Sequence, residues 1–325
     1  MNEIISIIIC TYNRDKYIYR SLELIAENHF PTDDYEIILI NNKSTDNTEN
    51  ECFRFRTNFP EIPFKYFVEE QQGLSYARNR GIAEATGDIL VFLDDDSFVK
   101  NNYLSNLKAN LTKYSDCMAF GGKILPLYES GKEPEWMCKW LFSLVSAIDL
   151  GDSVQLFSGK KFPIGANMGF RRDCIEKCGT FNVKLGRCAK NLIGGEEKDL
   201  FERIFQQKMA VYYFPDVEIE HVIPENRTTI EYIKRVGEGI GRSEKLRCKS
   251  SSLPPSLPRL RRNLSSICNV KYIKRLLLEC VKWGGSLVIW LQYMLQGRRV
   301  AANTIIIFRW FVTKGLLKRQ SPESI

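Results

Sequence analysis

The chain has 325 residues, of which 44% are hydrophobic, 26% charged and 12% aromatic. This composition is typical of a globular protein and excludes a disordered, collagen-like or coiled-coil chain. The length allows one large domain or two smaller ones. The net charge of +7 hides an asymmetry, because residues 1–226 hold 26 Lys and Arg against 34 Asp and Glu, whereas residues 227–325 hold 20 against 5. An acidic body and a strongly basic tail indicate two parts with different partners.

Over the first 125 residues, short apolar runs alternate with segments whose apolar residues recur at helical spacing. The predicted strands are 4–9, 35–40, 64–68, 88–93 and 117–124, and the predicted helices are 15–28, 46–58, 74–85 and 101–114. Such alternation implies βαβ units, that is, an α/β fold with a mostly parallel sheet flanked by helices. Farther along, a helix is predicted from the acidic turn near Glu196 to about residue 208, and a strand over 211–219.

The ten cysteines are scattered and form no CxxC pair. The closest two, Cys174 and Cys178, lack a second pair or a histidine at the spacing of a zinc site. We therefore expect free thiols in a reducing compartment. The apolar run Ile4–Cys10 lacks the basic leader and cleavage site of a signal peptide, so we interpret it as a strand and expect a cytoplasmic protein.

Three polar clusters follow the first, second and fourth predicted strands, at residues 11–14, 41–46 and 94–96. In open α/β sheets ligands bind at the carboxyl ends of the strands, so these clusters are expected to meet at one edge. The adjacent carboxylates of Asp94, Asp95 and Asp96 repel one another unless a cation or a donor offsets their charge. In an extended segment Asp94 and Asp96 point the same way and could share Mg²⁺ or Mn²⁺. The alternative is a capping cluster for the helix that follows.

Six ordered segments resemble the inverting, GT-A-fold family 2 glycosyltransferases, over roughly residues 4–242. They are SIIICTYNR (6–14), EIILINNKSTDNT (36–48), GLSYARNRGI (73–82), GDILVFLDDD (87–96), GANMGFRR (165–172) and GGEEKDL (194–200). The resemblance implies a GT-A-like, Rossmann-like catalytic domain over residues 1–226, followed by a basic helical region over 227–325. Within the catalytic domain, residues up to about 125 would form the nucleotide-sugar half and residues 126–226 the acceptor half.

The family uses a nucleotide-diphospho-sugar donor, and the resemblance implies that Thr11, Asn13, Arg14 and Asn42 hold its nucleobase, with uracil expected first. The family often has Asp where this chain has Asn41 or Asn42, and an amide donates as well as accepts hydrogen bonds. The alternative is an Asn-rich turn without a ligand.

The resemblance also implies roles around the diphosphate. Asp94 or Asp95 would contact ribose, and Asp96 would bind a metal that bridges the diphosphate. Arg78 has a fork of donors that suits phosphate oxygens. The alternative for Arg78 is a surface ion pair with Glu69 or Glu70.

Glu196 and Glu197 stand where the family usually carries Glu-Asp, the second acid being the general base. The resemblance therefore assigns the base to Glu197, with Glu196 as the alternative; both could instead be acids favoured at a helix N-terminus. The resemblance also implies that His221 completes the metal site, and the alternative is a hydrogen-bonded core residue.

Two apolar stretches lie in the basic region, at 281–295 and 300–317. The first is shorter than the ~20 residues of a spanning helix, and the second contains Arg309 and Lys314. Basic residues with tryptophans suit a helix lying on an anionic membrane surface, and the alternative is a packed helical hairpin that covers the catalytic sheet. No nucleic-acid-reading module is present, so no nucleic-acid partner is expected.

Together these features predict an inverting glycosyltransferase that moves a sugar, favoured as a UDP-sugar, to a glycan or lipid-linked acceptor in cell-surface polysaccharide synthesis. It would use Mn²⁺ or Mg²⁺ and could sit peripherally on the cytoplasmic face of the membrane. The alternatives are a non-catalytic nucleotide-sugar-binding protein and a metal-dependent nucleotidyltransferase.

Overall fold

A computed structural model describes residues 3–158, 161–186, 194–250 and 258–318. The chain divides into two compact units, each of which is described by itself. Unit 1 comprises Met1–Gly131, Val145–Ala189 and Glu196–Ile223, and unit 2 comprises Lys132–Leu144, Lys190–Gly195 and Pro224–Ile325. The division at residue 226 that the sequence suggests stays a prediction.

Unit 1 contains the predicted succession of strands and helices. Its strands are β1 (Ile5–Thr11), β2 (Tyr35–Asn41), β3 (Phe64–Val68), β4 (Ile89–Asp94), β5 (Ser97–Val99), β6 (Cys117–Tyr128), β7 (Gln155–Leu156), β8 (Asn167–Arg171) and β9 (Ala210–Ile223). Its helices are α1 (Asp15–Ala26), α2 (Thr48–Asn58), α3 (Leu74–Glu84), α4 (Tyr103–Lys113), α5 (Arg172–Cys178) and α6 (Glu196–Gln206). The elements predicted before residue 125 are confirmed, with ends that differ by a few residues.

The strands of the described residues form one sheet in the order β3-β2-β1-β4-β8-β6-β9-β5, with β7 beside β9. The part made of β3, β2, β1 and β4 is parallel, as predicted. Beyond β4 the sheet is mixed, since β8 is antiparallel to both β4 and β6, and β9 is parallel to β6. The described residues between β6 and β8 contain no α-helix of the kind that usually connects parallel strands, and β8 runs in the opposite direction to β6. The predicted α/β, GT-A-like fold class is confirmed.

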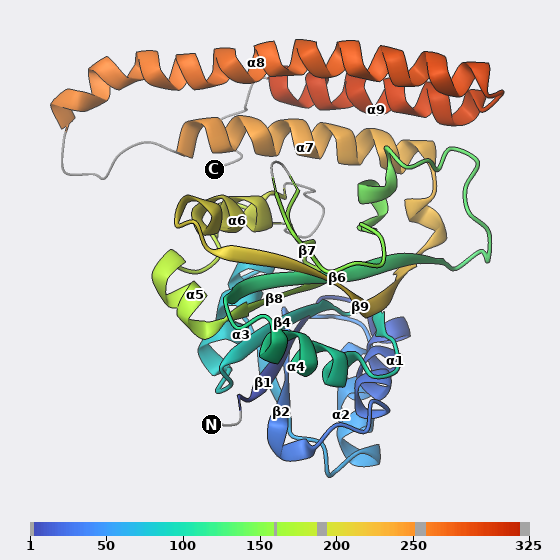
Figure 1. Ribbon diagram of the computed structural model, residues 1–325, viewed down its shortest axis with the longest axis vertical. Helices are drawn as coiled ribbons and strands as arrows, with labels where there is room; N and C mark the ends of the chain where they lie inside the picture. The colour runs from blue at the N-terminus through green and yellow to red at the C-terminus, as the bar shows by residue number, and fades with distance from the viewer. Residues whose placement is uncertain (1–2, 159–160, 187–193, 251–257, 319–325) are drawn as a thin grey trace. The chain divides into compact units, whose positions relative to one another are not determined.

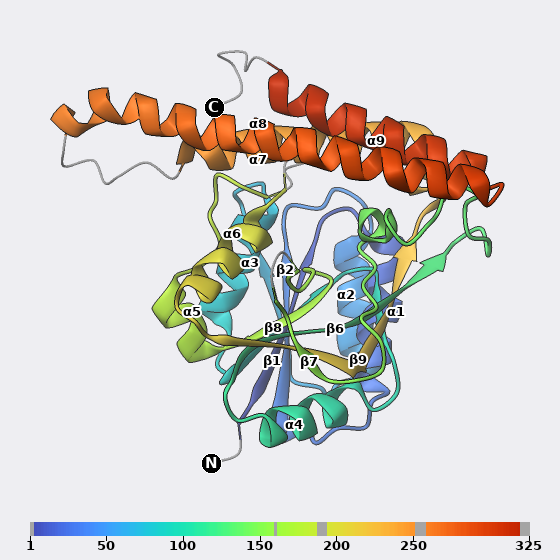
Figure 2. The same cartoon turned by 45° about the horizontal axis from the view of Figure 1, so that its top comes forward.

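Alternate residues of the central strands fill two cores, one on each face of the sheet. Ile7 and Ile9 of β1 pack with apolar residues of α1, α2 and α4, whereas Ile8 packs with those of α3, α5 and α6. Figure 2 shows α1 and α2 on one side of the strands and α5 and α6 on the other. Helices on both faces leave the strand ends as the accessible edges.

Unit 2 is dominated by α7 (Ile230–Ser250), α8 (Pro258–Leu295) and α9 (Arg299–Leu317). The glycine-rich residues 237–241 lie within α7 and make a close helix contact: a Cβ on Gly241 would lie 2.1 Å from the Val312 carbonyl oxygen of α9. The two apolar stretches of the sequence belong to α8 and α9, which run side by side in Figures 1 and 2. The packed-hairpin interpretation therefore describes their contact with each other. The serine- and proline-rich residues 251–257, which the sequence indicates as a loop or linker, lie outside the described residues.

The described cysteines are free thiols, as expected. Cys188 and Cys268 lie outside the residues for which the structure describes side chains.

Candidate active site

The register of the parallel strands brings the sequence-predicted loops to one edge of the sheet. Thr11 at the end of β1 lies beside Asn41 at the end of β2, and Cys10 lies beside Asp94 at the end of β4. Asp95 and Asp96 follow Asp94 directly in the chain. The juxtaposition expected from the strand-end rule is thus present.

A group of possible metal ligands lies at this edge, formed by Asp94, Asp96 and His221. One donor atom from each lies within 4.8 Å of the others. His221 reaches the group because β5 and β9 pair antiparallel, with Ser97 opposite His221, and because the Val222 amide donates to the Asp96 carbonyl oxygen at 2.9 Å. The His221 Nε2 atom is 2.9 Å from Asp96 Oδ1 and 4.0 Å from Asp94 Oδ2.

The hydrogen bonding of His221 makes this group suitable for a cation. Its Nδ1 atom lies 3.1 Å from the Val145 carbonyl oxygen, which can only accept a hydrogen bond. In the neutral imidazole the hydrogen is then on Nδ1, and the Nε2 lone pair faces the two carboxylates. The Nε2 lone pair and the carboxylate oxygens repel one another, and a proton or a cation between them removes this repulsion. Two carboxylates and one imidazole are a donor set that fits Mn²⁺ or Mg²⁺.

Arg14 supplies positive charge to the neighbouring carboxylates. Its Nε lies 3.3 Å from Asp95 Oδ1, and its Nη2 lies 3.6 Å from Asp96 Oδ2. Burial raises the pKa of Asp95 to about 7, with Arg14 opposing the shift and Asp96 adding to it. Arg14 therefore sits against the acidic cluster, and the nucleobase contact suggested for it stays a prediction.

Arg78 lies between the possible metal ligands Asp94, Asp96 and His221 and the acids at the start of α6. Its Nη1 lies 3.0 Å from Glu196 Oε1, and its Nη2 lies 3.1 Å from Glu197 Oε1 and 3.9 Å from Asp94 Oδ1. The side chain is 3% exposed, with Cζ 5.2 Å from the centre of the Phe181 ring.

The alternative of a surface ion pair for Arg78 is wrong. Arg78 is buried, and one of the suggested partners, Glu70, pairs with Lys43 at 2.9 Å. The suggested contact of Arg78 with phosphate stays a prediction, since its donors face carboxylates in this structure.

Glu196 and Glu197 are the first residues of α6 and differ in accessibility. The Glu196 side chain is 5% exposed and that of Glu197 is 22% exposed, so Glu197 is the better placed to meet an acceptor. Burial raises the pKa of Glu197 to about 7, with Arg78 opposing the shift and Glu196 adding to it. A carboxyl group that titrates near neutral pH is suited to proton transfer.

Gly165 is a site residue that sequence reasoning did not single out. A Cβ atom there would lie 2.0 Å from Glu197 Oε1 and 2.2 Å from Arg78 Nη2. Only glycine lets the ion pair lie against the backbone at this point. Its signal was its place at the start of the segment GANMGFRR.

The asparagines of the suggested nucleobase pocket hold loops together. Asn42 donates from Nδ2 to the carbonyl oxygens of Glu69 and Gln71, at 3.0 and 2.8 Å, and its Oδ1 accepts from the Gly73 amide at 2.8 Å. Asn13 has a positive φ of 55° and accepts from the Thr45 amide at 2.7 Å. These bonds favour the Asn-rich turn, and base recognition by Thr11, Asn13 and Asn42 stays a prediction.

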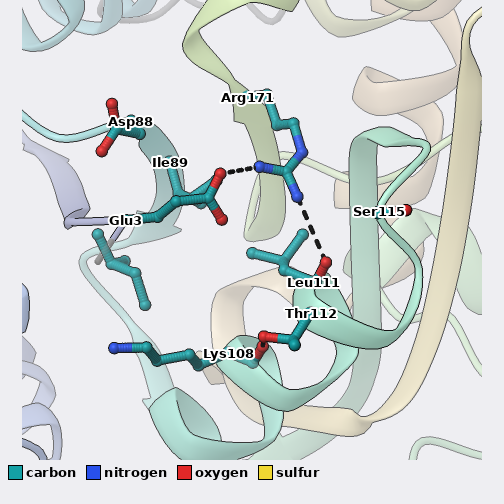
Figure 3. A pocket seen from close by; sticks show the side chains of 9 residues that line it. Glu3, Asp88, Ile89, Lys108, Leu111, Thr112, Ser115 and Arg171 are labelled. Carbon is teal, nitrogen blue, oxygen red and sulfur yellow. Dashed lines mark hydrogen bonds and ion pairs between the residues drawn. The ribbon is translucent and has the colours of Figure 1, made fainter. Parts of the chain in front are cut away.

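A cavity of about 930 Å³ lies at the opposite edge of the sheet, beside the first residues of β1 and β4. Figure 3 shows Arg171 pointing toward Glu3 and the Leu111 carbonyl oxygen. Lys108, which also lines the cavity, pairs with Asp34 at 2.6 Å. The basic groups Arg171 and Lys108 of this cavity are thus engaged by the protein itself, and the predicted site residues lie at the other edge.

Comparison with known proteins adds four findings. Residues 6–179, more than half of the chain, match the family model described as glycosyl transferase family 2. The glucosyl-dolichyl phosphate glucuronosyltransferase of Haloferax volcanii is 24% identical over 235 residues, covering 70% of this chain and 72% of that protein. The succinoglycan biosynthesis protein ExoM of Rhizobium meliloti is 26% identical over 234 residues, 71% of each chain. The solved mannosyltransferase PcManGT from Pyrobaculum calidifontis, in complex with GDP-Man and Mn²⁺, has a TM-score of 0.60 at 17% identity, covering 98% of this chain and 89% of that chain.

Proposed function

Because the chain belongs to glycosyl transferase family 2, we propose that it transfers a sugar from a UDP-sugar to a hydroxyl of a glycan or lipid-linked acceptor, with inversion at the anomeric carbon. That it is a glycosyltransferase follows from the family and from the names of its relatives. The observation that carries the proposal is the proximity of the Asp94–Asp96–His221 group to Glu197, with Arg78 between them. Relatives named for dolichyl phosphate and succinoglycan support an acceptor in cell-surface polysaccharide synthesis.

The donor would bind at the strand-end edge. Asp94, Asp96 and His221 would hold a divalent cation, and the imidazole favours Mn²⁺ over Mg²⁺. When bound, such an ion offsets negative charge on the departing nucleoside diphosphate. Asp95 is assigned to the ribose, and the loop with Thr11, Asn13 and Arg14 to the nucleobase, together with Asn42.

Glu197 would act as the general base. Its carboxylate accepts the proton of the acceptor hydroxyl while the acceptor oxygen forms a bond to the anomeric carbon and the bond to the diphosphate breaks. Arg78 holds this carboxylate through its Nη2 atom, and Glu196 holds the other end of the same guanidinium. The base is therefore fixed in position before the acceptor arrives.

We also propose where in the cell the protein acts. The catalytic unit would work in the cytoplasm, and the basic region over 227–325 would make peripheral contact with the anionic cytoplasmic face of a membrane. Such contact would keep the enzyme near a lipid-linked acceptor.

The test is a panel of nucleotide sugars, scored for release of nucleoside diphosphate with Mn²⁺, with Mg²⁺ and with a chelator. We expect release from a UDP-sugar that depends on the metal. Binding of UDP without turnover of any donor would favour a non-catalytic binding protein. Release of pyrophosphate from a nucleoside triphosphate would indicate a nucleotidyltransferase instead.

A further inference from the structure

The contact between α8 and α9 includes charged and polar side chains that are buried. Glu279 of α8 pairs with Arg309 of α9 at 3.0 Å, and Arg309 also donates to Ser286 Oγ at 3.3 Å. Trp283 donates to Thr313 at 3.0 Å. The buried groups on this side of α8 therefore include a carboxylate and a hydroxyl, joined to α9 by hydrogen bonds.

The opposite side of α8 is aliphatic and exposed. Val281 is 71% exposed and Val288 is 70% exposed. The residues that continue this side are three, four or seven positions apart, as on one face of a helix. This outer face of α8 consists of Ile273, Leu277, Val281, Val288, Leu291 and Leu295.

Helix α8 thus buries polar side chains against α9 and exposes apolar ones, which is the inverse of the usual arrangement in a water-soluble protein. A helix facing water normally buries its apolar side and exposes its polar side. Contiguous exposed apolar residues mark a surface that contacts a partner or a membrane. Hydrogen bonds between helices hold segments together where the surroundings are apolar, because the polar groups then have few other partners.

From this inversion we propose that the outer face of α8 lies in the apolar layer of a lipid bilayer, in the plane of the membrane. This inference rests on the proposed peripheral membrane contact and names the face that makes it and the lipid layer it reaches. Charge supports a lipid surface as the occupant, since residues 227–325 hold 20 Lys and Arg against 5 Asp and Glu. Lys274 lies exposed beside Ile273, within reach of anionic headgroups.

The packing of α9 favours this in-plane position over a spanning one. By length and composition α9 could cross a membrane, but 39% of its apolar window is buried inside the protein. It packs along α7, which carries Lys234, Arg242 and Lys245. A spanning α9 would draw these charges toward the hydrocarbon, which is costly. At the turn between α8 and α9, Arg298 also donates to the Met137 carbonyl oxygen at 2.7 Å.

Vesicle flotation of the full chain tests the proposal. Wild-type protein should float with phosphatidylcholine–phosphatidylglycerol vesicles, and much of the binding should persist in 1 M NaCl, where attraction between exposed charges is screened. The double variant Val281→Asp, Val288→Asp should lose at least tenfold in the bound-to-free ratio. Leu156→Asp is the matched control, since Leu156 is an exposed apolar residue of unit 1 and its replacement should leave binding unchanged.

Three further measurements keep the result interpretable. Val281→Asn with Val288→Asn serves if the aspartates disturb α8, as judged by circular dichroism. Turnover of the donor should be the same in the double variant and the wild type, which separates membrane binding from the proposed chemistry. Equal flotation of wild type and variant, or binding that disappears in 1 M NaCl, would overturn the proposal. A dimer in vesicle-free solution that the double variant splits, with no flotation of either protein, would assign the face to a second copy instead.

Discussion

Arg78 and Glu197 are 119 residues apart in the chain, yet Nη2 of the one lies 3.1 Å from Oε1 of the other. The same nitrogen lies 3.9 Å from Oδ1 of Asp94, one of the three possible metal ligands. One buried guanidinium therefore links the acid assigned as base to the group assigned to the metal. Its rigid fork suits this arrangement, since two of its nitrogens face two different carboxylates of α6.

Replacing Arg78 by Gln should destabilise unit 1, because Glu196 and Glu197 would lose their shared cation in a buried place. Removing one partner of a buried ion pair typically costs about 3–5 kcal/mol. Thermal denaturation of the variant measures this. The matched control is Arg80→Gln on the same helix, whose exposed pair with Glu84 should contribute no more than about 1 kcal/mol. Equal melting temperatures for the two variants would contradict the role of Arg78.

Glu197→Gln should keep donor binding and lose transfer. The amide preserves the size of the side chain but cannot take the acceptor proton, and loss of a general base costs about 10²–10⁴-fold in rate. Isothermal titration with UDP and a transfer assay measure the two properties separately. Glu196→Gln is the comparison, because its side chain is nearly inaccessible. Near-normal transfer by Glu197→Gln, with loss in Glu196→Gln, would move the base to Glu196.

His221→Ala and Asp96→Ala should each weaken metal-dependent donor binding by at least tenfold, because each removes one of three donors that lie within 4.8 Å of one another. Titration of Mn²⁺ at fixed UDP-sugar gives the apparent metal affinity. Asp173→Asn is the control, since Asp173 is an exposed acid of α5. Unchanged Mn²⁺ dependence in Asp96→Ala would remove that residue from the metal site.

Asn42→Asp distinguishes a structural role from a base-reading role. A carboxylate cannot donate to the Glu69 and Gln71 carbonyl oxygens, so we expect a loss of stability of about 1–3 kcal/mol for each unsatisfied group. Asn41→Asp should be better tolerated, because Asn41 Nδ2 meets the Tyr66 hydroxyl, which can turn its proton from Glu49 to the new carboxylate. Denaturant unfolding measures both. A stable Asn42→Asp protein with tighter UDP binding would favour the nucleobase contact.

Local patterns were sufficient for the strands, the helices and the strand-end edge of the first 125 residues, because periodicity depends on neighbours in the chain. The choice of ion partners was not predictable in this way. Arg78 was given Glu69 or Glu70 as alternative partners, but its real partners come from α6, far along the sequence. Likewise, His221 could be suggested as a ligand, whereas the Val145 carbonyl that fixes its ring could not. The exposed apolar side of α8 was not predictable either, because the positions of apolar residues alone do not indicate which side of a helix is buried.

The raised pKa of Glu197 predicts two pH effects. Its carboxyl titrates at about 7 in the folded chain against an ordinary 4.5, chiefly because of burial. A base must be ionised, so kcat/KM should fall as pH drops below about 7.

The folded state also holds this proton more tightly than the unfolded state, so the contribution of Glu197 to stability should decline as pH rises from 4.5 to 7. Glutamine does not titrate, and the melting temperature of Glu197→Gln relative to wild type should therefore increase across this window, in the presence of a chelator. A constant difference between the two proteins from pH 4.5 to 7 would show that the folded chain leaves this carboxyl at its ordinary pKa.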